Sequence, residues 1–188
     1  MSDTNSEELK NVDVSIDYRA HAEQLHVPII EGFKVQSDDN PQTILLASGY
    51  GYVEQLASDG HVEDGEFEER IKKVIGETKE IMINNGATNV DHSFAYYNDY
   101  TNGVFNFKIY VCDMIVPEDN EQVIVRQLNA YFVEPKMKDF YQLSISAGPF
   151  TMPTKYLKPG VIDLQNDKIT QTLDKFIKVL MDNLTYKN

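Results

Sequence analysis

The stretch FNFKIYVCDM, residues 105–114, decides the fold class, because its apolar side chains recur at every second position. Successive side chains of a β-strand point to opposite faces of the sheet, so this spacing predicts a strand with one apolar face. That face carries Phe105, Phe107, Ile109 and Val111. The other face carries Asn106, Lys108, Tyr110, Cys112 and Met114.

Similar strands are expected on both sides of this one. His92–Tyr97 reads as a strand before it, across a turn at Asn98–Gly103. Ile124–Phe132 follows, and the turn-forming stretch Glu134–Lys138 leads into a further strand at Tyr141–Ile145. Short connections between successive strands indicate an antiparallel meander.

The second face of this predicted sheet is not cleanly polar. Its apolar members are Tyr110, Cys112, Met114, Val123, Val125, Tyr131 and Val133. An antiparallel sheet with one wet face would show polar residues there, so something must cover it: the N-terminal hairpin, a helix or a partner. The residues we single out as a candidate binding face for a partner or ligand are Tyr110, Gln127, Asn129 and Tyr131.

Two helices are predicted around the meander. The first runs from about Gly65 to Asn84, begins among acidic residues and stops at Gly86. Its apolar stripe is Phe67, Ile71, Val74, Ile75, Thr78 and Ile81. The second helix closes the chain, with a stripe of Ile169, Leu173, Phe176, Ile177, Leu180 and Leu184. Recurrence at spacings of three and four residues is the helical period.

The N-terminal part is less regular. Residues 1–20 read as a flexible acidic tail, and 21–188 as a single domain. Val27–Val35 and Thr43–Ala47 predict a hairpin, whereas Gly49–Gly65 looks irregular. The expected class is therefore α+β: an antiparallel sheet of about five or six strands packed against two long helices, as in an α/β/α sandwich.

This order of elements resembles the PsbP/DcrB-type α/β/α sandwich superfamily, which includes the Ran-binding Mog proteins. The resemblance covers about residues 27–185 and is carried by the run from Pro28 to Val35, the helix from Phe67 to Gly86, the strands from His92 to Ile145 and the helix ending at Leu184. It includes no diagnostic motif, so it implies no functional residue. It implies a mostly non-catalytic protein, such as a subunit, a lipoprotein, a chaperone or an adaptor.

The charge balance argues against two classes of partner. Thirty acidic residues against 17 basic ones give a net charge of −13. Nucleic acids and anionic membranes repel such a surface, so neither is expected as a partner. Acidity suits solubility, which we favour, but also a cationic protein partner or mimicry of nucleic acid. A single cysteine, Cys112, and a polar N-terminus favour the cytoplasm.

No motif in the sequence predicts catalysis, a cofactor or a metal site. Gly49-Tyr50-Gly51 lacks the third glycine of a dinucleotide loop, and the acids from Asp59 to Glu69 do not have the spacing of an EF-hand. A dyad of Cys112 with a histidine is disfavoured, because Cys112 lies within a strand. Asp113 continues the apolar row; we interpret it as marking a strand end rather than as a buried, paired carboxylate.

The leading functional hypothesis is a non-catalytic protein-binding module, either an adaptor or chaperone-like. The expected partner is another protein, and homodimerisation stays open. A carrier of a small apolar molecule and an enzyme of unrecognised type, such as a hydrolase using Asp or Glu, are the alternatives.

Overall fold

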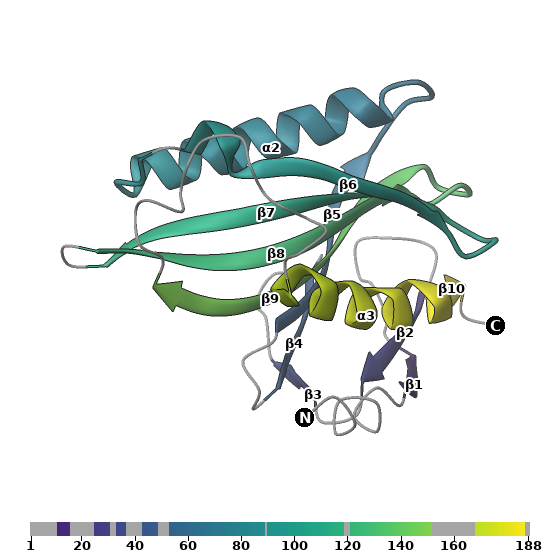
Figure 1. Cartoon of the computed structure of the whole chain (residues 1–188). Coiled ribbons are helices and arrows are strands. Elements are labelled where there is room, and N and C mark those ends of the chain that lie inside the picture. Colours follow the sequence, from purple (N-terminus) through teal and green to yellow (C-terminus); the bar gives the residue numbers. More distant parts are fainter. Residues whose placement is uncertain are drawn as a thin grey trace.

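The computed structural model describes residues 11–15, 25–30, 33–36, 43–48, 53–88, 90–118, 121–151 and 168–186. In this part of the chain, a large antiparallel sheet lies between two helices, and a small sheet lies beside the second helix (Figure 1).

The large sheet has seven strands in the order β3-β4-β5-β9-β8-β7-β6. Its five long strands are β5 (Val53–His61), β6 (Phe94–Thr101), β7 (Asn106–Glu118), β8 (Glu121–Val133) and β9 (Asp139–Thr151). β3 (Phe33–Gln36) and β4 (Thr43–Ser48) extend one edge as a hairpin, which has the predicted second strand but a first strand that begins only at Phe33. Strands β6 to β9 form the predicted meander, so the class and the topology of the meander are confirmed.

One prediction about this sheet was wrong. The irregular region expected at Gly49–Gly65 contains β5, which pairs with both β4 and β9. Its sequence, VEQLASDGH, has no apolar alternation to reveal a strand. β5 is stabilised by the strands that pair with it on both sides, so its position in the sheet outweighs the weak strand propensity of its own residues.

A second, three-stranded sheet has the order β1-β2-β10. It consists of β1 (Asn11–Ser15), β2 (Leu25–Ile30) and β10 (Thr185–Tyr186). The run Val27–Val35 is thus divided between the two sheets. Asn11–Ser15, which we expected in the tail, pairs with β2 instead, and the alternation of Val12 and Val14 suits that pairing. Residues 1–10 and 16–20 lie outside the described residues.

The two helices pack on opposite faces of the large sheet (Figure 1). α2 (Phe67–Asn84) ends where predicted: Gly86 has a φ of 94°, and the N–H groups of Gly86 and Ala87 bond the carbonyls of Ile83 and Met82. This is a Schellman cap, which requires a left-handed residue and so favours glycine. α3 (Lys168–Asn183) confirms the second helix.

The α3 side of the sheet is the main core. It buries the predicted apolar row of β7 against α3, with Ile109, Val111, Leu173 and Ile177 essentially inaccessible to solvent. Aromatic rings reinforce it, because Phe132 stacks on Tyr141 and also contacts Phe105 and Phe107.

The α2 side has smaller clusters. One gathers Val62, Ile71, Tyr131 and Phe140, and another gathers Met82, Ala87, Val90 and Ile115. Val90 belongs to the short 3-10 helix η1 (Val90–His92). The predicted stripe of α2 fails at its end: Ile81 is 57% exposed and Met82 is buried in its place. No helix in the described residues is long and apolar enough to cross a membrane.

Candidate functional site

Three connections meet at one end of the large sheet. β5 ends beside the start of β9, where His61 faces Asp139, and β6 turns into β7 between Thr101 and Asn106. The β8–β9 turn lies next to them, since β8 pairs with the first residues of β7. The loop from β5 into α2 therefore shares this end with the β6–β7 and β8–β9 turns.

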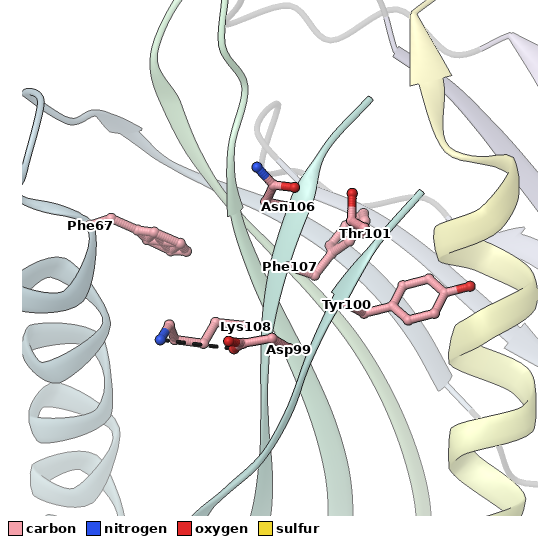
Figure 2. A pocket seen from close by; sticks show the side chains of 7 residues that line it. All are labelled: Phe67, Asp99, Tyr100, Thr101, Asn106, Phe107 and Lys108. Carbon is pink, nitrogen blue, oxygen red and sulfur yellow. Dashed lines mark ion pairs between the residues drawn. The ribbon is translucent and has the colours of Figure 1, made fainter. Parts of the chain in front are cut away.

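A hollow of about 480 Å³ opens here beside the first turn of α2. It is lined by Phe67, Asp99, Tyr100, Thr101, Asn106, Phe107 and Lys108. Figure 2 shows Lys108 and Asp99 extending toward α2, whereas Tyr100 points toward α3. The hollow thus combines an aromatic lining with charged groups on its α2 side.

A second hollow of about 300 Å³ adjoins the first, because Phe67 and Asn106 line both. The remaining lining residues are Val62, Glu63, Asp64, Gly65, Val104, Phe105, Val133 and Pro135. Val104 and nearby Met137, each at the tip of a turn, are 42% and 41% exposed. We call the two hollows together the end groove.

Acidic side chains lie along the rim of the end groove, and two lysines there form exposed ion pairs with them. Lys108 Nζ lies 3.2 Å from Glu68 Oε1 and 3.8 Å from Asp99 Oδ1, and Lys138 Nζ lies 2.6 Å from Asp64 Oδ1. The hydrogen bond with Glu68 and the charge of Asp99 raise the pKa of Lys108. Exposed pairs of this kind are worth about 0–1 kcal/mol, so an arriving cation can displace them at small cost.

Buried polar groups hold the turns in place. The side-chain N–H groups of Asn102 donate to the carbonyls of Met181 and Leu184, at 2.6 and 2.8 Å, and its oxygen accepts from the N–H groups of Val104 and Phe105. The β6–β7 turn therefore caps the end of α3, whose last carbonyls have no partner within the helix.

The β8–β9 turn is held in a similar way. The buried carboxylate of Glu134 accepts the N–H groups of Lys136 and Met137, both at 2.6 Å, and the hydroxyl of Tyr186. The β8–β9 turn and the strand β10 are thus joined through the side chain of Glu134.

Comparisons with known proteins support the architecture. No family model matches the chain, and no curated protein sequence matches it. Among solved structures, a point mutant of the protein Mog1 superposes with a TM-score of 0.58 at 9% identity, over 94% of this chain and 95% of that one. The chain has a Mog1/PsbP-like fold.

A second Mog1 structure supports the same fold. The Ran-binding protein Mog1p of Saccharomyces cerevisiae superposes on this Mog1-like chain with a TM-score of 0.55 at 7% identity, covering 94% of this chain and 96% of that one. LpqN of Mycobacterium tuberculosis, which is involved in cell envelope biogenesis, gives 0.46 at 11% identity over 100% and 97%. At these identities the likeness establishes the fold alone.

The candidate binding face predicted from the sequence lies on the α2 side of this Mog1-like sheet. Tyr131 is 1% exposed and Asn129 is 2% exposed, whereas Tyr110 and Gln127 are half-buried. The ring of Tyr131 packs against α2, so over this residue the face is covered by the chain itself. Burial raises the pKa of Tyr131. A binding role for the four residues stays a prediction, and only Tyr110 and Gln127 have substantially exposed atoms.

An aromatic row crosses this face and links it to the end groove. Tyr96 contacts Tyr110, Tyr110 contacts Tyr131, and Tyr131 stacks on Phe140, with centroid distances of 5.6, 5.9 and 5.7 Å. Phe140 meets Phe67 of the end groove at 5.9 Å. Such pairs contribute about 0.5–1.5 kcal/mol each beyond burial.

Cys112 and Asp113, the two residues that the sequence raised as candidates for reactive or buried charged groups, both lie in the interior of the sheet. Cys112 is fully buried, and that burial raises its pKa well above the ordinary value, so it is a protonated and unreactive thiol. The strand-end interpretation of Asp113 was wrong: β7 continues to Glu118, and the buried Asp113 carboxylate accepts two hydrogen bonds from Arg126, at 2.6 and 2.8 Å. Arg126 lies opposite it in β8, which the alternation of β8 could have revealed.

Across the described residues, no group of three or more His, Cys, Asp and Glu side chains could hold a metal ion. Sequence reasoning also missed the end groove. The region Asn98–Gly103 was expected to be a turn, whereas β6 continues through Thr101 and brings Asp99 opposite Lys108.

Proposed function

We propose that this protein is a non-catalytic protein-binding module and that the end groove is its binding surface. One observation carries the proposal: the exposed apolar side chains of Val104 and Met137 lie beside two hollows with an aromatic lining, and carboxylates surround them. An apolar centre with a polar rim is the usual anatomy of a protein interface. The net charge of −13 favours a basic partner.

The fold gives secondary support to a protein-binding role. Mog1p, which shares it, is a Ran-binding protein, so this arrangement of sheet and helices serves protein recognition in at least one other chain. This is an analogy at the level of fold, and the binding surface proposed here rests on the residues of the end groove instead.

The proposal is tested by site-specific cross-linking in the native cell at native expression level. A benzoylphenylalanine residue in place of Val104, on the rim of the end groove, should cross-link one protein reproducibly. The matched control replaces Ile83, which is 53% exposed and about 24 Å along α2 from Phe67. The absence of a specific product at Val104, or the same products from both positions, contradicts the proposal.

A small-molecule carrier is the second candidate, because the larger hollow, at about 480 Å³, falls within the volume range of ligand pockets. A carrier predicts that a ligand raises the melting temperature, and that Phe67→Ala, which removes one wall of the hollow, abolishes the rise. A thermal-shift screen of aromatic and apolar compounds against both proteins measures this. A null screen together with a specific Val104 cross-link favours the protein-binding module.

A further inference from the structure

Strand β6 is the outermost strand of the large sheet among the described residues, and it also forms one wall of the end groove. Three consecutive residues, Asp99, Tyr100 and Thr101, line the larger hollow. The edge of the sheet and the hollow are therefore neighbouring parts of one surface, as the view in Figure 2 illustrates.

The hairpin geometry decides which backbone groups of β6 point outward. The N–H of Asn102 donates to the carbonyl of Phe105 across a two-residue turn, so this pair starts the antiparallel ladder. Hydrogen-bonded and non-hydrogen-bonded pairs then alternate. By this alternation, Tyr100 and Phe107 form a hydrogen-bonded pair. Thr101 and Asp99, on either side of Tyr100, are in non-hydrogen-bonded pairs. The backbone N–H and C=O groups of Asp99 and Thr101 consequently point away from β7.

Carboxylates border this edge on both faces of the sheet. Tyr96 is hydrogen-bonded to Asp99, and that bond raises the pKa of Tyr96. Burial first, and then Asp174 of α3, raise the pKa of Tyr97 to about 12. The hydroxyl of Tyr100 donates to Asp182 of α3, which raises the Tyr100 pKa too.

Two lysines near this edge, Lys108 and Lys178, are paired with carboxylates. Lys108 pairs with Glu68 and Asp99, and Lys178 pairs with Asp174 at 2.9 Å. The four carboxylates of Glu68, Asp99, Asp174 and Asp182 thus outnumber these two lysines. Together these six groups carry a net negative charge, which complements a positively charged segment.

We infer that β6 receives an extended, basic segment of the partner protein as an added strand, with one of its side chains entering the larger hollow beside Phe67. Outward backbone groups would supply hydrogen bonds, and the flanking carboxylates would select Lys or Arg at alternate positions. The inference rests on the proposed function and names the chemistry of its partner. A second copy of this chain is disfavoured, because two edges of equal negative charge would meet.

The first experiment measures binding of a fluorescent, N-acetylated Lys-Val-Lys-Val-Lys-Val-Lys peptide by anisotropy. Asp99→Pro removes one outward N–H but no β6–β7 hydrogen bond, and proline is tolerated at such edge positions. Asp99→Ala is the matched control, which loses the charge and keeps the N–H. We expect Asp99→Pro to bind at least tenfold more weakly than Asp99→Ala, with both folded by circular dichroism.

A second measurement does not depend on the fold of a variant. In an extended peptide, the N–H groups of the valines point to one edge and those of the lysines to the other. N-methylation at the valines, or separately at the lysines, therefore blocks one edge at a time. An added strand uses only one edge, so one methylated peptide should bind and the other should not. Hydrogen exchange of the wild-type protein should slow at Asp99 and Thr101 when the peptide is added.

Three outcomes overturn the inference. The first is equal binding by both methylated peptides or by both Asp99 variants, which indicates attraction by charge alone. The second is no measurable binding of the peptide to the wild-type protein. The third is slow exchange at Asp99 and Thr101 in a free protein that sediments as a dimer, which assigns the edge to a second copy. The Val104 cross-link is scored separately, so its persistence in Asp99→Pro would reject strand addition and leave the proposed function standing.

Discussion

The two faces of the large sheet are built on different principles. The α3 face is a single apolar cluster in which Phe107, Ile109 and Val111, alternate residues of β7, are buried against the helix. The α2 face is divided into smaller clusters and includes buried polar groups, where Ser144 donates to Asn129 at 2.6 Å and Gln142 donates to Ser144 at 2.9 Å. The first face accounts for most of the hydrophobic core, whereas the second leaves room for a groove.

The largest effect should come from the ion pair of Asp113 with Arg126. Both residues are buried, at 9% and 7% exposure. Arg126→Met leaves the carboxylate uncompensated, so we expect a loss of about 3–5 kcal/mol in the free energy of unfolding, measured with urea. The double variant Asp113→Leu with Arg126→Met should recover most of this loss. A single variant as stable as the wild type would contradict the account.

Truncation of apolar side chains compares the faces directly. Leu180 of α3 is 1% exposed, whereas Ile75 of α2 is only partly buried. Leu180→Ala should cost about 2–5 kcal/mol, and Ile75→Ala about 1–2 kcal/mol, in urea unfolding. Equal losses would show that the two faces contribute equally to the core, contrary to the comparison drawn above.

The cap that Asn102 places on α3 should have a smaller effect. Asn102→Ala removes both donors to Met181 and Leu184, and we expect thermal unfolding to report a loss of about 1–3 kcal/mol. Asn102→Asp keeps the acceptor for the turn but sets a negative charge against the helix C-terminus, so it should be no more stable than Asn102→Ala. Wild-type stability in Asn102→Asp would rule out the capping role.

The smallest expected effect is a dependence of stability on alkaline pH. The pKa of Tyr97 is about 12 in the folded protein against an ordinary value of 10, so the folded state holds this proton more tightly. The resulting stability is present below pH 10 and is lost as the pH rises from about 10 to 12. In Tyr97→Phe, the free energy of unfolding should change less over this pH range. Urea unfolding at several pH values between 9 and 12 measures the difference. An unchanged profile would contradict the assignment.

The fold could be predicted wherever one residue type recurs with a clear period. The rows of β7 and α3 are nearly pure in apolar residues, and Gly86 provides an unambiguous helix stop. β5 could not be predicted, because its residues do not alternate and one of its two pairing partners, β9, is distant in the sequence. Asp113 was misread because its own strand gives no sign of its partner, which lies in the facing row of the next strand, β8.

The candidate site was less accessible to sequence reasoning. The end groove is assembled from three connections, and no single segment carries its pattern. The tyrosines were recognised as an unusual face, yet their burial depends on where α2 lies. Asp99 looked like a turn residue, because Asn102-Gly103 and its neighbours are typical of turns and the true turn is only two residues long.

The amide of Asn102 also has a consequence for the order of events during synthesis. It bonds carbonyls about eighty positions later in the chain. A chain emerging from a ribosome therefore exposes the apolar row of β7 until α3 has been made, and contacts of such long range slow folding. Until α3 packs against it, this face of the sheet is an open hydrophobic surface, so burial of the β7 row is a late step in folding.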